Sequence, residues 1–96
     1  MEIANNIAKQ LGNATFCLIG AKNLGSLENG LQFQIGRNPK KVQYITIKLN
    51  GLDLYDIEFT RITRDLERIV IAEENNIYAD MMHSLIEKNT GLITKF

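Results

Sequence analysis

Residues 42–63, VQYITIKLNGLDLYDIEFTRIT, constrain the fold of this chain most, because they read as two β-strands joined by a turn. Apolar side chains alternate with polar ones on both sides of Asn50-Gly51: first Ile45, Ile47 and Leu49, then Tyr55, Ile57 and Phe59. A period of two is typical of a strand with one buried face. Asn-Gly readily supplies the left-handed backbone of a hairpin tip. We therefore predict an antiparallel hairpin here.

The loop of this hairpin is constrained by parity, because residues directly opposite one another point to the same face of a sheet. A two-residue Asn-Gly turn would bring Asp56 opposite Ile45, on the apolar side. An odd-length loop, with Gly51 as a left-handed bulge residue, avoids this conflict. Its pairs join Ile45 or Ile47 to Tyr55 and Ile57. We predict the odd loop.

The residues before the hairpin predict a helix, two strands and their connections. Residues 2–11 carry apolar side chains four apart and predict a short amphipathic helix that stops at Gly12-Asn13. Residues 14–20 are apolar at both odd-numbered and even-numbered positions, which predicts a strand that is covered on both faces. The glycine-rich residues 21–30, AKNLGSLENG, predict a loop of about ten residues. Residues 31–35 alternate as a strand, and residues 36–41, GRNPKK, predict a turn.

The residues after the hairpin predict a short strand and a second helix. Residues 68–72 alternate, and the period then changes from two to 3.6. Asn75 or Asn76 is suited to cap the helix, with Asp80 in its first turn and Gly91 at its end. Residues 92–96 predict a tail or a short edge strand.

This order of elements predicts the α+β class, with an antiparallel meander sheet of about five strands. The N-terminal and C-terminal helices must bury their apolar stripes, most simply by packing on the apolar face of the sheet. The 96 residues are enough for one two-layer core, so we predict a single domain over residues 1–96. No strand-helix-strand crossover is visible, which disfavours a doubly wound nucleotide-binding sheet.

Composition narrows the classes of partner and compartment. Apolar residues make up 45% and charged residues 23%, as in an ordinary globular protein. Eleven basic and eleven acidic side chains cancel, so nucleic-acid binding would need a local patch. Cys17 lies in an apolar run and predicts a buried, inert thiol in a reducing compartment. No segment has the pattern of a signal peptide or a membrane helix, so we expect a cytoplasmic protein that does not bind membranes.

The acidic residues Asp53, Asp56 and Glu58 are the first candidates for chemistry. Asp56 and Glu58 are two apart on one predicted strand and share a side, where paired carboxylates can hold Mg²⁺ or divide acid and base roles. A restriction-type nuclease needs a lysine two residues after the second acid, and Thr60 stands there. A solvated strand face, with cross-strand pairing to Lys48, is the favoured interpretation.

Other constellations give weaker indications of chemistry. Residues 20–26, GAKNLGS, superficially resemble a phosphate loop, but Ser26 stands where its lysine should be. His83 is the only histidine, so it and the distant Cys17 do not make a ligand set for a transition metal. We expect no catalytic residue, no cofactor and no metal.

A basic cluster at the predicted turn, Arg37, Lys40 and Lys41, is the candidate for contact with phosphates. Lys48 extends it along the next strand, and Tyr44 is the nearby aromatic that could stack on a base. Three or four contacts would give weak, salt-sensitive binding. A lysine-rich turn also keeps the rim of a sheet soluble, which is the favoured interpretation.

Four segments form a pattern that covers nearly the whole chain: IGAKNL (19–24), GRNPKKVQYITIKLNGLDLYDIEFTRI (36–62), IYADMM (77–82) and EKNTGLITKF (87–96). In this order they resemble a family of small uncharacterised proteins encoded by bacteriophages, prophages and conjugative elements. The motif LNxxDLYDxEFxRI is the most specific part. The chain departs from the family at Thr63, Asn76 and Ile93, where arginine, glycine and tyrosine are usual. The resemblance implies a mobile-element protein in the host cytoplasm and brings no active site with it.

This context favours a non-enzymatic protein-interaction module that acts by occupying a partner's surface, including that of a host-defence protein such as a CRISPR effector. The expected partner-binding residues lie in the loop 22–29, the turn 37–41 and the acidic strand face: Lys22, Asn23, Arg37, Lys40, Lys41, Asp53, Asp56 and Glu58. The alternative is a weak nucleic-acid-binding accessory protein of phage replication or transfer, and a metal-dependent nuclease comes third. A homodimer through a sheet edge is a further possibility.

Overall fold

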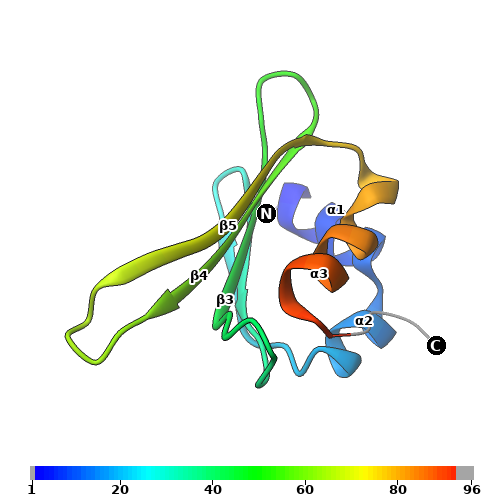
Figure 1. The fold of residues 1–96 in the computed structure, drawn as a ribbon. Helices are drawn as coiled ribbons and strands as arrows, with labels where there is room; N and C mark the ends of the chain where they lie inside the picture. Colours follow the sequence, from blue (N-terminus) through cyan, green and yellow to red (C-terminus); the bar gives the residue numbers. More distant parts are fainter. Residues whose placement is uncertain (1, 93–96) are drawn as a thin grey trace.

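Five antiparallel strands form one sheet, in chain order, in a computed structural model that describes residues 2–92 (Figure 1). The strands are β1 (Lys22–Leu27), β2 (Gly30–Gln34), β3 (Tyr44–Leu49), β4 (Tyr55–Ile62) and β5 (Arg68–Ile77). The helices are α1 (Glu2–Leu11), α2 (Asn13–Leu18) and α3 (Met82–Thr90), with a 3₁₀ turn, η1 (Ala79–Met81), before α3. All helices lie on one side of the sheet. The predicted α+β meander with a helix near each end is confirmed.

The core lies between this helical layer and the helix-facing side of the sheet. Alternate residues of the central strands are fully buried there, namely Phe33, Ile45, Ile47, Ile57 and Phe59. Ile7 of α1 and Met82 and Ile86 of α3 are also fully buried, as the stripes of two amphipathic helices require. Among residues 2–92, no helix has both the length and the apolar character that crossing a bilayer requires.

The central hairpin has the predicted odd loop. Ile47 lies opposite Ile57 and Leu49 opposite Tyr55, which leaves residues 50–54 as the loop. The left-handed residue is Asp53, with φ 61°, so the prediction that Gly51 takes this role is wrong. The side chain of Asn50 explains the difference. Its Oδ1 accepts from the backbone N–H groups of Leu52 at 2.9 Å and Leu54 at 3.2 Å, which folds the loop around Asn50.

The strand predicted over residues 14–20 is wrong, because α2 occupies this segment. Its apolar residues were expected to fill both faces of a strand, but helical spacing buries only Thr15 and Ile19, four apart. Cys17 falls on the other side of α2 and is exposed, so the predicted buried thiol is also wrong. Gly12, with φ 86°, turns the chain between α1 and α2.

The loop predicted over residues 21–30 is also wrong, since β1 pairs with β2 across a short turn at residues 28–29. β1 is an edge strand whose side chains are mostly exposed, so no apolar alternation marks it in the sequence. The pairing is irregular between Lys22 and Gly25, where Asn23 adopts φ 56°. The strand predicted at residues 31–35 and the non-strand segment after it are confirmed.

The strand predicted at residues 68–72 extends to Ile77, and the helix begins later than predicted. Asn75 and Asn76 belong to β5 and cap no helix, because the backbone N–H of Asn76 donates to Asp56 Oδ1 at 3.0 Å. Asp80 lies in the 3₁₀ turn, and Gly91, with φ 80°, ends α3 as predicted. β5 has two irregularities against β4, one opposite Phe59–Thr60 and one opposite Tyr55–Ile57. Of the predicted tail, residues 93–96 lie outside the described residues.

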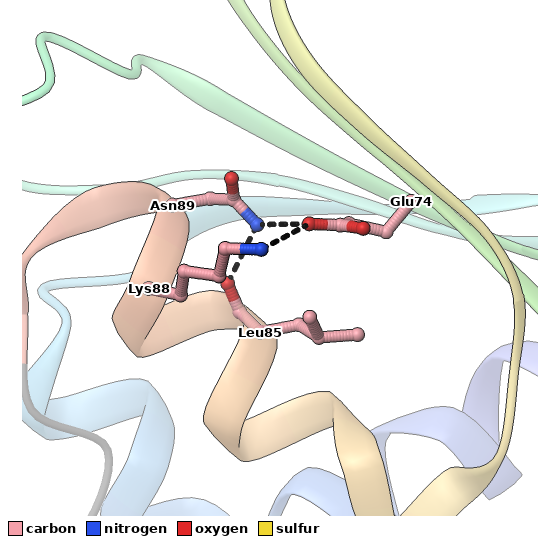
Figure 2. Close-up of polar contacts among 4 residues, drawn as sticks. All are labelled: Glu74, Leu85, Lys88 and Asn89. Carbon is pink, nitrogen blue, oxygen red and sulfur yellow. Dashed lines mark hydrogen bonds and ion pairs between the residues drawn. The ribbon is translucent and has the colours of Figure 1, made fainter.

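A polar cluster fastens the last turn of α3 to β5 (Figure 2). Asn89 Nδ2 donates to Glu74 Oε2 and to the carbonyl of Leu85, both at 2.9 Å. Lys88 Nζ lies 3.8 Å from the same Glu74 oxygen. This cluster holds the last turn of α3 at a fixed position against β5.

Candidate functional site

An open groove of about 850 Å³ lies where β2 ends, β3 begins and β4 ends. We call it the basic groove, because its described lining includes five cationic residues: Lys22, Arg37, Lys41, Arg61 and Arg64. No aspartate or glutamate of residues 2–92 lines it. The cations come from β1, from the loop of residues 36–43, and from the end of β4 and the turn after it.

The loop of residues 36–43 is folded by one side chain, that of Asn38. Its Nδ2 donates to the carbonyls of Gly36 at 2.9 Å and Val42 at 2.7 Å, and its Oδ1 accepts from the Val42 N–H at 3.0 Å. Lys41 takes the left-handed conformation, with φ 60°. These bonds fix the backbone of the loop, and with it the points from which the side chains of Arg37 and Lys41 project.

The other two walls of the basic groove are tied to this loop and to the sheet. Gln43 joins the loop to β4, because its Oε1 accepts from the Ile62 N–H at 2.8 Å. On the β1 side, Asn23 Nδ2 donates to Gln34 Oε1 at 2.9 Å, beside Lys22. The irregular pairing after Lys22 re-aims this end of β1. Residues far apart in sequence are thereby held around one groove.

Arg61 has an unusual environment in the wall of the groove. Its side chain is partly buried, and its Nε is buried without a hydrogen-bond partner among the described residues. Leaving a buried donor unsatisfied costs about 1–3 kcal/mol. Because this Nε is itself buried, an acceptor in the groove reaches it only if the Arg61 side chain moves.

The electric field in the basic groove depends on whether its cations are paired with acidic side chains. The ion pairs seen among residues 2–92 join Arg68 to Glu58 and Lys88 to Glu74, and neither contains a groove cation. The chain as a whole has a formal net charge of zero. The five cations therefore create a positive field near the groove, although the molecule as a whole is neutral. This local field attracts anions.

Asp56 and Glu58 lie on the side of the sheet that faces away from the helices, because Ile57 and Phe59, which alternate with them, are buried in the core. We call this side the outer face, and Asp56 and Glu58 point to it as predicted. Asp56 Oδ1 accepts from Asn50 Nδ2 at 3.1 Å and from the Asn76 N–H. Glu58 pairs with Arg68, whereas the expected ion pair with Lys48 is not seen in the described part of the chain. The side chains of Asp56 and Glu58 are thus bonded within the protein.

A small pocket of about 190 Å³ lies beside these residues on the outer face, with Glu73 and Lys48 in its wall. Within residues 2–92, no three His, Cys, Asp or Glu side chains are grouped so that they could hold a metal ion. Asp53 is exposed at the tip of the β3–β4 loop. His83 Nδ1 lies 3.5 Å from Thr15 Oγ1, at the contact between α3 and α2.

The structure separates the residues that the sequence nominated. Lys22, Arg37 and Lys41 meet in the basic groove, and Asn23 is bonded to its wall. Lys40 is exposed on the same loop but does not line the groove, and Lys48 lies opposite Asp56 at the other end of β3. Arg61 and Arg64 were missed, although the spacing of three arginines along residues 61–68 is a signal of charge there.

Comparison of the chain with protein-family models, with curated proteins and with solved structures gives no match. Function is therefore inferred from the groove itself.

Proposed function

We propose that this protein is a non-enzymatic interaction module of a phage or mobile element, which binds an anionic part of its partner in the basic groove. The observation that supports this function is the convergence of five cations with no carboxylate among the described lining residues. The mobile-element context comes from the sequence resemblance. In that context the partner belongs to the host or the element, including host-defence proteins, and the protein acts by occupying its surface.

Preorganisation of the cations supports binding as their role. Asn38 and Gln43 hold the loop, so an incoming anion does not have to order it. A binding surface that is already ordered loses less conformational entropy on association. Because no groove cation is in an ion pair among residues 2–92, the arrival of an anion breaks no ion pair there.

Retention on an immobilised polyanion such as heparin tests this function. The variant Arg37→Gln/Arg64→Gln removes two groove cations, and Lys9→Gln/Lys48→Gln removes two exposed cations outside the groove. Both variants have the same net charge, so a difference between them reports position and not overall charge. We expect the groove variant to elute at clearly lower salt and the matched control to elute close to the wild type. Equal shifts of the two variants would remove the groove as the binding site.

A further inference from the structure

We infer that the anion bound in the basic groove is the phosphate backbone of a single-stranded nucleic acid. This inference rests on the anion-binding part of the proposed function and specifies the anion. It draws on the size of the groove, on the kinds of donor in its wall and on the aromatic residue beside it.

The size of the groove favours a chain over a folded surface. Its volume of about 850 Å³ is that of a ligand pocket. A folded protein partner presents a broad patch, typically about 800 Å² on each side of an interface. A groove of pocket size between a loop and a strand end instead admits an extended polymer segment, which can enter and leave through its open side.

The donors in the wall favour phosphate over carboxylate side chains of a peptide. Three of the five cations are arginines, Arg37, Arg61 and Arg64. Their planar guanidinium groups bind phosphate through paired hydrogen bonds and also stack on bases. The Oε1 atoms of Gln34 and Gln43 already accept bonds from the protein. Each of these amides therefore keeps its NH₂ group as a donor for base or backbone oxygens.

An aromatic side chain lies where a base would leave the groove. Tyr44 is directly opposite Gln34 in the β2–β3 pairing, and Gln34 lines the groove. Residues opposite one another share a face, so the partly exposed ring of Tyr44 is next to the groove wall. Bases stack on such rings with little regard to sequence. An acidic peptide would gain nothing comparable from this ring.

The experiment measures anisotropy of labelled single-stranded DNA and RNA of about 12 nucleotides, within the usual site size of small binding folds. A duplex of the same length and a labelled polyglutamate peptide are the comparison probes. Three to five phosphate contacts predict a slope of log affinity against log salt between about −2 and −3.5 for a single strand. We expect single strands to bind more tightly than the duplex and the peptide.

Two sets of variants test whether the groove cations and the ring of Tyr44 contribute to binding. Arg37→Gln/Arg64→Gln should weaken single-strand binding by about tenfold or more at low salt, and Lys9→Gln/Lys48→Gln by no more than about twofold. Tyr44→Leu should weaken it by about fivefold, whereas Tyr44→Phe should retain it, because stacking needs the ring and not the hydroxyl. Lys22→Gln, at an exposed lining residue, replaces the double variant if that variant does not fold.

The outcomes separate the two proposals. Polyglutamate binding that needs the groove cations, with no single-strand binding, would overturn the nucleic acid and leave the proposed function standing. Tighter binding of the duplex, or full binding by Tyr44→Leu, would overturn the single-strand assignment. If no probe binds at low salt, both the inference and the anion-binding function fail.

Discussion

The acidic outer face and the basic groove differ in where their charges find partners. On the outer face, Asp56 accepts two hydrogen bonds from the protein and Glu58 pairs with Arg68. In the groove, no described carboxylate pairs with the cations, and Arg61 Nε has no partner there. The two regions lie on the same strand, β4, only a few residues apart. Charge in the first region stabilises the fold, and charge in the second is available to a ligand.

The largest effect on stability is expected from Asp56. Asp56→Ala leaves the N–H of Asn76 without its side-chain acceptor and removes one of the two acceptors of Asn50 Nδ2, the other being Asn76 Oδ1, and should reduce the free energy of unfolding by about 2 kcal/mol. Asp56→Asn is the matched control, because one retained carbonyl oxygen can accept both bonds. Urea denaturation measures both variants. A loss of single-strand or polyanion binding at unchanged stability would give the outer face a functional role.

A smaller effect on stability, combined with an effect on binding, is expected from Asn38. Asn38→Ala removes the three hydrogen bonds that fold the loop and should cost roughly 1.5 kcal/mol. Binding in the groove should weaken as well, although no cation is removed, because Arg37 and Lys41 lose their fixed positions. Asn5→Ala, at an exposed position of α1, is the control. Unchanged binding would show that the groove does not depend on loop order.

The ion pair on the outer face should contribute less. Arg68 is about half exposed, and exposed pairs contribute roughly 0–1 kcal/mol. Arg68→Gln should therefore destabilise the protein by less than about 1 kcal/mol, and the difference should shrink at high salt. Glu58 also lies directly opposite Glu73, so removing Arg68 leaves the repulsion between these two carboxylates without a compensating positive charge. Thermal unfolding at two salt concentrations measures this difference in stability. A loss of stability that grows with salt would exclude the ion pair as its cause.

The smallest effect on stability is expected in the groove. Arg37→Gln/Arg64→Gln should change the free energy of unfolding by no more than about 0.5 kcal/mol, since neither side chain is in an ion pair within the described part of the chain. The same variant should lose polyanion binding. A stability loss comparable with that of Asp56→Ala would mean that the groove cations are structural, and the contrast between the two regions would disappear.

Much of the fold follows from local sequence pattern, and the errors have physical causes. The alternation on β3 and β4 predicts their register, because a one-residue slip would expose a whole apolar face. The segment at residues 14–20 has no clear period, so packing of α2 against Phe33 through Phe16 decides its structure. The edge strand β1 buries almost nothing and leaves no apolar signal. Asn76 is held in β5 by Asp56, twenty residues earlier, which local pattern does not contain.

Only some of the cations of the basic groove can be recognised in the sequence. Arg37 and Lys41 are in one turn and can be recognised there, but Arg61 and Arg64 join them only through the pairing of β3 with β4. That pairing brings residues 43 and 62 into hydrogen-bond contact. To predict a charged surface that is built from several strands, the pairing register of the strands must be known before the charged residues can be grouped.

The irregular pairing at both margins of the sheet has a consequence for how copies of the chain behave together. β1 and β5 are the outermost strands, and each departs from regular spacing, β1 after Lys22 and β5 at two places. An uneven row of donors and acceptors is a poor template for a further strand. Concentrated solutions should consequently resist the strand-by-strand growth that leads to fibres.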